Sequence, residues 1–183
     1  MNYKTHIAGG VTLGLMIYAS SLIEMGTGPL IVASTCTGLV IGSVLPDIDH
    51  PNSFISKKAK ITSFFTSKMF KHRTTTHSLV INSMFVGLLL LLTQNYSSVY
   101  FSKFVNALGT GILSHIILDM LTTGGVAIFY PITAKRFNLA KINVNKGKAG
   151  RLKENLIRAM LIAISISIII SHSSGIKVFL ANL

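Results

Sequence analysis

Histidine and aspartate residues recur in four short segments of the sequence, and each segment adjoins an apolar stretch. Both residue types are common metal ligands, and a helix places residues four apart on the same face, as it would His115 and Asp119. Residues 46–51 begin and end with proline, which interrupts a regular helix and leaves the acids between them on irregular backbone. The candidate ligands are His6, Asp47, Asp49, His50, His72, His77, His115 and Asp119.

The ligand types narrow the choice of metal. The chain has a single cysteine, Cys36, so neither a disulfide framework nor a cysteine-based zinc site is available. Histidine together with carboxylate suits zinc, with manganese or iron as alternatives. Because four ligands are normally sufficient for one zinc ion, eight candidates predict two or three ions, with some carboxylates bridging. His6 is the candidate most readily explained by packing alone.

A site with several metal ions is typical of hydrolytic enzymes. The metals lower the pKa of a bound water and neutralise the oxygens of a phosphoester. Asp47 or Asp49 is expected to act as the base. Arg73 is expected to hold a phosphoryl oxygen through its two-pronged guanidinium, although it is equally well explained as one more loop cation.

The composition indicates that the elements positioning these residues cross a membrane. Of the 183 residues, 50% are hydrophobic and 12% charged, whereas about 25% of an average soluble domain is charged. One domain, 1–183, is expected, and Gly38 and Gly42 are spaced to let two of its helices approach closely. The first apolar stretch could instead be a signal peptide, since Lys4 precedes it and a small-residue region follows. The sequence predicts an all-α transmembrane bundle with spans near 7–23, 29–46, 78–93, 104–121 and 156–171.

The distribution of charge predicts the orientation of this bundle. The chain has 17 Lys and Arg against 5 Asp and Glu, and the cations concentrate in loops 51–77 and 122–155. The alternate loops contain only Lys103. By the positive-inside rule, both basic loops and the N-terminus are cytoplasmic, in a bacterial inner membrane, and the C-terminus lies outside. All four ligand-bearing segments then lie on the same side, which predicts a metal centre at the cytoplasmic ends of the helices.

The basic loops also bear on partners. Loops of this kind set topology and contact anionic phospholipid headgroups. Nucleic acid is not an expected partner, because the basic stretches have few interleaved aromatic residues and no helix-turn-helix pattern is present. The oligomeric state stays open.

Together, His6 and the segments 42–51, 72–78 and 114–119 resemble the signature of the YdjM-type family, the predicted inner-membrane metal-dependent hydrolases of bacteria. The resemblance covers about residues 1–131 and implies a membrane hydrolase. More remotely, the ligand set is similar to that of the all-helical zinc phospholipase C and P1 nuclease group, whose His and Asp ligands hold three zinc ions, which suggests phosphoester cleavage. A glutamate ligand typical of that group has no obvious counterpart, since Glu24 and Glu154 lie outside the four segments. The shared signature is His6, Gly42-x-x-x-Pro46-Asp47-x-Asp49-His50-Pro51, His72-Arg73-Thr74-x-Thr76-His77-Ser78 and Ser114-His115-x-x-x-Asp119.

The expected function is hydrolysis of a phosphoester, such as a phospholipid headgroup or a phosphorylated small molecule, at the inner leaflet. The alternative is a transporter or channel in which the same residues bind a translocating metal ion or relay protons. Against it, the polar residues gather at one face instead of continuing across the bilayer. Two non-catalytic readings also remain: a metal that only braces the bundle, or hydrogen bonds between helices without any metal.

Overall fold

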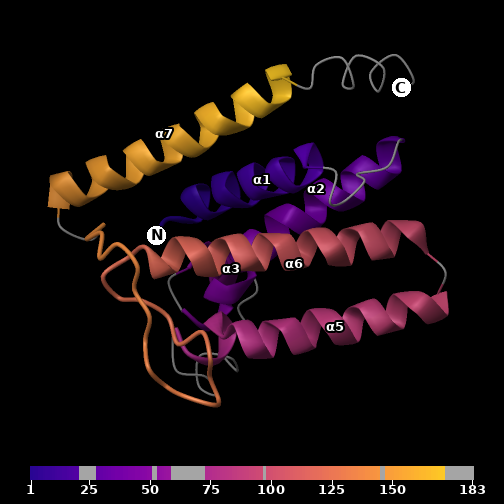
Figure 1. Ribbon diagram of the computed structural model, residues 1–183, viewed down its shortest axis with the longest axis horizontal. Helices are drawn as coiled ribbons and strands as arrows, with labels where there is room; N and C mark the ends of the chain where they lie inside the picture. Colours follow the sequence, from indigo (N-terminus) through magenta and orange to yellow (C-terminus); the bar gives the residue numbers. More distant parts are fainter. Residues whose placement is uncertain (21–27, 51–52, 59–72, 97, 145–146, 172–183) are drawn as a thin grey trace.

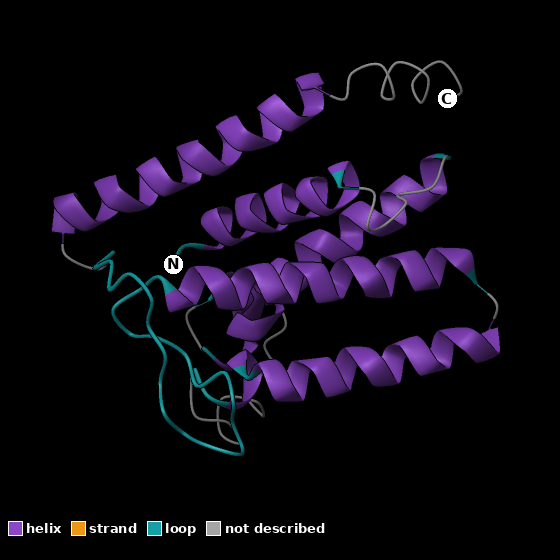
Figure 2. Ribbon diagram, viewed as in Figure 1, coloured by secondary structure: helices purple, strands orange, loops and turns teal. Residues whose placement is uncertain are grey.

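The computed structural model describes residues 1–20, 28–50, 53–58, 73–96, 98–144 and 147–171. In these residues the fold is all-α, as predicted, and the only strand-like pairing is a pair of isolated bridges, Thr122 with Ile142 and Val126 with Phe137 (Figure 2). The long helices are α1 (Tyr3–Ala19), α2 (Pro29–Val44), α5 (Leu79–Tyr96), α6 (Val99–Met120) and α7 (Gly147–Ser171). The short helices are η1 (Leu45–Asp49), α3 (Phe54–Lys58) and η2 (Thr75–His77).

Three helical segments of the described chain are long and apolar enough to cross a membrane. They are Pro29–Asp49, Val99–Met120 and Gly147–Ser171. A further apolar helix, Leu79–Gln94, is shorter. The number of spans therefore stays a prediction, although a helical membrane bundle accounts for the composition and the fold.

Three helices begin earlier than the apolar stretches that predicted them: α1 at Tyr3, α6 at Val99 and α7 at Gly147. The first begins at Tyr3, because the side chain of Asn2 accepts a hydrogen bond from the backbone N–H of Lys4 and caps the helix. The last begins at Gly147 and includes a charged segment that hydropathy excludes. The extensions of α1 and α7 add polar turns at the same end of the bundle.

Helix α6 lies at the centre of the bundle, with α1, α2 and α5 packed around it and α7 packed on α1 (Figure 1). The closest approach is between α2 and α6. A Cβ atom at Gly42 would lie 2.1 Å from the carbonyl oxygen of Leu108, and one at Gly38 would lie 2.4 Å from that of Phe104. The prediction that these two glycines permit close helix packing is confirmed.

The helix directions bring all of the polar ends together. Helices α1, α5 and α7 begin at the end of the bundle where α2 and α6 finish (Figure 1). Every long helix therefore presents one terminus to the same region. This is the arrangement that the alternation of basic loops predicted.

Candidate metal centre

Five of the eight predicted ligands meet at this end of the bundle. They come from four different elements: α1, η1, η2 and the last two turns of α6. The side chains of His6, His77 and His115 are 0% exposed, that of Asp119 is 1% exposed, and that of Asp47 is 20% exposed. The cluster is thus accessible to solvent at Asp47, while its other four side chains are buried. We call the Asp47 side the open edge of the cluster.

The five side chains form two overlapping groups of three ligands. The first consists of His6, His115 and Asp119, and the second of Asp47, His77 and His115. In each group the ligand atoms all lie within 4.8 Å of one another. His115 belongs to both groups and is therefore the centre of the cluster.

The distances within the cluster suit a metal ion. His115 Nε2 lies 3.2 Å from His77 Nε2, and each of these atoms lies 3.7 Å from Asp47 Oδ1. Asp119 places Oδ2 at 3.5 Å from His77 Nε2 and Oδ1 at 3.6 Å from His6 Nε2. Ligand atoms bound to one tetrahedral zinc at about 2.0–2.1 Å are separated by about 3.3–3.4 Å. The observed separations lie close to this value.

The other ring nitrogens of two histidines are held by outer partners. His115 Nδ1 lies 2.7 Å from the carbonyl oxygen of Ser43, which can only accept, so Nδ1 carries the proton and Nε2 presents its lone pair to the cluster. Thr76 Oγ1 donates to Asp49 Oδ2 at 2.6 Å and lies 2.9 Å from His77 Nδ1. Because the hydroxyl proton is used on Asp49, His77 Nδ1 donates to Thr76. Outer-shell bonds of this type orient histidines for metal binding.

The two converging Nε2 atoms require a positive partner between them. Burial alone lowers the pKa of His77, but hydrogen bonding to the Asp119 and Asp47 carboxylates outweighs burial and raises that pKa above its ordinary value. A proton on His77 or a metal ion would each relieve the repulsion between the lone pairs. The cluster therefore has the electrostatics of a cation site.

His6 supplies a second indication of a missing partner. Its ring stacks on that of His115 with centroids 3.7 Å apart, and neither His6 nitrogen has a hydrogen-bond partner although the side chain is fully buried. Asp119 Oδ2 is also buried, but Arg73 Nη2 lies 3.0 Å from it and His77 Nε2 lies 3.5 Å from it. Leaving a buried polar group unsatisfied costs about 1–3 kcal/mol, so native proteins seldom do so without a reason. A metal ion beside Asp119 would satisfy one of the two His6 nitrogens, and packing alone does not account for His6.

Arg73 borders the cluster in a strained backbone conformation. Its φ of 62° lies in the left-handed region, which is uncommon for residues other than glycine. Its Nη2 lies 3.0 Å from Asp119 Oδ2, and Nη1 donates to Thr122 Oγ1 at 3.2 Å. A Cβ atom at Gly124 would lie 2.0 Å from Nη1, so a glycine at this position makes room for the guanidinium. The connection after α6 thus holds Arg73 against the cluster.

A pocket of about 700 Å³ opens beside the cluster. It shares Asp47 and Arg73 with the cluster, and its wall includes His50, Lys57 and Glu154 together with the first residues of α1. The volume lies within the range of about 300–1,000 Å³ that is usual for small-molecule sites. A substrate in this pocket would lie between two cations and the open edge of the cluster.

The remaining predicted ligands lie in three different places. His50 lines the pocket and belongs to neither ligand group of the described residues. Asp49 is 2% exposed and accepts the hydrogen bond from Thr76, so it acts on the cluster through His77. His72 lies outside the described residues. The roles of these three as ligands stay predictions, as does the choice between Asp47 and Asp49 as base, although only Asp47 reaches the pocket.

Glu154 lines the pocket beside the cluster, although none of the sequence motifs includes it. Its Oε1 accepts hydrogen bonds from the backbone N–H of Asn2 and, at 3.1 Å, from Thr5 Oγ1. It thereby ties α7 to the first turn of α1, next to His6. The only available signal was its rarity, since it is one of five acids in the chain.

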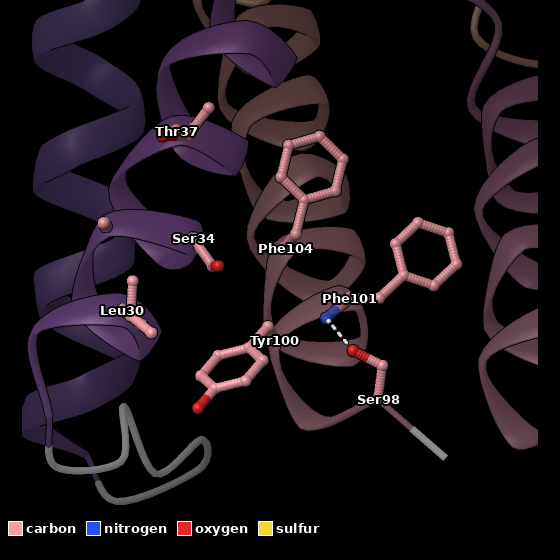
Figure 3. Close-up of a pocket in the computed structure, with 8 residues that line it drawn as sticks. Leu30, Ser34, Thr37, Ser98, Tyr100, Phe101 and Phe104 are labelled. Carbon is pink, nitrogen blue, oxygen red and sulfur yellow. Dashed lines mark hydrogen bonds between the residues drawn. The ribbon is translucent and has the colours of Figure 1, made fainter. Parts of the chain in front are cut away.

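A second pocket, of about 540 Å³, lies between α2 and α6 at the other end of the bundle (Figure 3). Leu30, Tyr100, Phe101 and Phe104 make its lining largely apolar. Among the described residues, the lining includes no histidine or carboxylate side chain. The described part of this pocket therefore offers no groups suited to the chemistry of the cluster.

Comparisons with known proteins agree with the sequence signature. Uncharacterized protein YvsG of Bacillus subtilis is 33% identical over 136 residues, which are 74% of this chain and 76% of that protein. Inner membrane protein YdjM of Escherichia coli is 36% identical over 113 residues, as is its counterpart in Shigella flexneri. That match covers 59% of this chain and 54% of each relative, so it spans about half their length.

No solved structure matches the chain, so the more remote similarity to the zinc phospholipase C group stays a prediction. The family described as YdjM inner membrane protein matches residues 1–177. Together with the convergence of the signature residues on one site, this match confirms the family resemblance. The chain belongs to the YdjM inner membrane protein family.

Proposed function

We propose that the protein is a membrane-embedded metal-dependent hydrolase that cleaves a phosphoester, such as a phospholipid headgroup, at the inner leaflet. The observation that carries this proposal is the buried cluster of three histidines and two aspartates that opens on a polar pocket. A cluster that only braced the bundle would need neither the open edge at Asp47 nor the adjacent cations.

Zinc is the metal that we propose, with manganese or iron as alternatives. Asp119 directs one oxygen toward His6 and the other toward His77, which supports two ions. A third ion would have to be held by residues outside the two groups. When bound, the metal supplies an activated water and neutralises charge on the phosphoester oxygens.

The chain's own residues would bind and orient the substrate. Arg73 offers a guanidinium at the edge of the cluster, and Lys57 adds a second cation in the same pocket. Both suit the charge of a phosphate group. Asp47, which reaches both the cluster and the pocket, is placed to accept a proton from the attacking water.

The decisive experiment measures hydrolysis of a panel of phospholipids and soluble phosphoesters by purified protein of known metal content. We expect cleavage of at least one panel member in the zinc-loaded protein and none in the His77→Ala variant. The Lys57→Gln variant should keep its metal and its kcat, while KM rises about fivefold, because an exposed charge contributes on the order of 1 kcal/mol. Lys103→Gln, which removes a cation from the first turns of α6 at the opposite end of the bundle, is the matched control.

The proposal fails if the protein binds metal stoichiometrically and cleaves no member of the panel. The rival function, transport of a metal ion or of protons, is tested with the same preparation reconstituted in vesicles. Uptake of metal into those vesicles, with loss of uptake in His77→Ala, would establish the transporter instead.

We further propose that the cluster end of the bundle faces the cytoplasm. The measurement is labelling of single cysteines in intact cells with a membrane-impermeant maleimide, in a Cys36→Ser background. The Lys141→Cys variant, in the basic connection, should stay unlabelled until the cells are opened. The Val99→Cys variant, at the exposed start of α6, should be labelled from outside. The reverse pattern would invert the orientation and place the site on the outer face.

A further inference from the structure

The connection between α6 and α7 is firmly attached to the ends of the helices. The backbone N–H of Leu139 donates to Met120 O at 2.7 Å, in the last turn of α6, and Leu79 N–H, at the start of α5, donates to Ile128 O at 2.9 Å. Figure 2 shows this connection as a long loop at the cluster end of the bundle. Because it is bonded to two helix ends, it lies at the level where a membrane-spanning bundle leaves the hydrocarbon.

The middle of this connection has a defined shape. Val126 and Phe137 exchange two backbone hydrogen bonds, of 3.1 and 2.8 Å, which join the two ends of the loop between them. The rings of Phe129 and Phe137 meet edge to face at 5.4 Å, and Lys135 Nζ lies 5.8 Å from the centre of the Phe137 ring. These contacts hold the segment in one arrangement.

This arrangement leaves large apolar side chains exposed among cations. Ile132 is 80% exposed and Leu139 is 68% exposed, although neither lies on a helix. The neighbouring charged residues are Lys135, Arg136 and Lys141, all of them exposed. The sequence has no acid between Asp119 and Glu154, so this surface carries only positive charge. Apolar side chains flanked by basic residues are typical of segments that lie in the interface of an anionic membrane.

We propose that residues 129–141 form a binding surface for an anionic phospholipid bilayer. Ile132 and Leu139 insert among the headgroups, and the three cations contact lipid phosphates. This goes beyond a long-range effect of charge on topology, because it requires two specified apolar side chains to enter the lipid. It is also independent of whether the cluster catalyses hydrolysis.

The chain contains no tryptophan, so a single introduced tryptophan reports on its own surroundings. The test uses the full-length Ile132→Trp variant in nanodiscs of phosphatidylcholine, with or without phosphatidylglycerol, and in discs whose lipids carry bromine near the headgroup. We expect blue-shifted emission and a roughly twofold larger quenching by brominated lipid when phosphatidylglycerol is present. Because Ile132 is so exposed, this substitution leaves the packing of the bundle unchanged. The control is Thr123→Trp, at an exposed position of the same connection outside the proposed surface, whose emission should resemble that in water in both lipids.

The contribution of the charges is tested by adding Lys135→Gln, Arg136→Gln and Lys141→Gln to the Ile132→Trp variant. We expect the difference between the two lipid compositions to disappear. The proposal is overturned if Ile132→Trp emission stays water-like in anionic discs, or if the neutralised variant is quenched as before. Blue-shifted emission that brominated lipid does not quench, and that depends on the number of copies per disc, would show that a second copy covers the surface instead.

Discussion

Replacing Asp119 with alanine is expected to abolish the zinc binding that we propose for the purified protein. Asp119 is the only residue whose two oxygens face both halves of the described cluster, at 3.6 Å from His6 Nε2 and 3.5 Å from His77 Nε2. Loss of an outer-shell partner typically lowers metal affinity about 10–100-fold, and loss of a direct ligand should exceed this. The measurement is elemental analysis of protein that has been stripped with chelator, reloaded with zinc and freed of excess metal.

Two further variants separate metal loss from misfolding. Asp119→Ala also leaves Arg73 without its 3.0 Å ion pair, whereas Asp119→Asn keeps the shape of the side chain and should still bind less metal. Asp49 contacts the cluster through Thr76, so Asp49→Asn should lower the affinity for zinc by about 10–100-fold, less than the loss of a direct ligand. Asn155→Ala, on the exposed face of α7, should change nothing. Full zinc occupancy in folded Asp119→Ala would show that Asp119 is not a metal ligand. Absence of zinc from the folded, reloaded wild-type protein would show that the cluster is a network of hydrogen bonds without metal.

The Gly42→Ala variant is expected to lower both the stability of the bundle and its affinity for metal. Its Cβ would lie 2.1 Å from the carbonyl oxygen of Leu108, which is part of the helix backbone and cannot rotate away. Helices α2 and α6 must therefore separate, at a cost of about 1–3 kcal/mol or more for overpacking. The next residue, Ser43, accepts the His115 bond of 2.7 Å, so the separation would displace a central ligand.

This effect is measured by thermal unfolding, followed by circular dichroism in detergent, together with metal content. The matched control is Gly87→Ala on α5, where an added Cβ meets no other atom within 4 Å. We expect the unfolding temperature to fall clearly in the Gly42→Ala variant and to stay unchanged in the Gly87→Ala variant. Equal behaviour of the two variants would mean that the close approach of α2 and α6 does not position the site.

The charges of the loops predicted that the ligand-bearing segments lie at the same end of the bundle. The structure confirms that the described segments do so. His115 and Asp119, four residues apart on α6, face the same cluster, as helix periodicity requires. The family signature likewise placed Asp47 and His77 near them. Local patterns were sufficient here because the alternating direction of successive long helices determines which ends meet.

The limits of prediction are clearest at His6 and Glu154. His6, which packing alone could explain from sequence, is fully buried within the cluster, and neither of its nitrogens has a hydrogen-bond partner among the described residues. Glu154 lies 149 residues from Thr5, to which it is hydrogen-bonded. No periodicity or motif links positions so far apart. Their relation depends on how α7 packs on α1.

The sequence by itself determined the membrane bundle, the family and the set of side chains at one end, because hydropathy, loop charge and residue type are local properties. Only the tertiary structure decided which of the candidate ligands among the described residues lie together in one cluster. It placed His50 in the pocket and Asp49 behind Thr76, and it revealed the apolar and basic surface around Ile132. These outcomes depend on the distance between helices and on the path of the connection after α6, which arise from packing between distant residues.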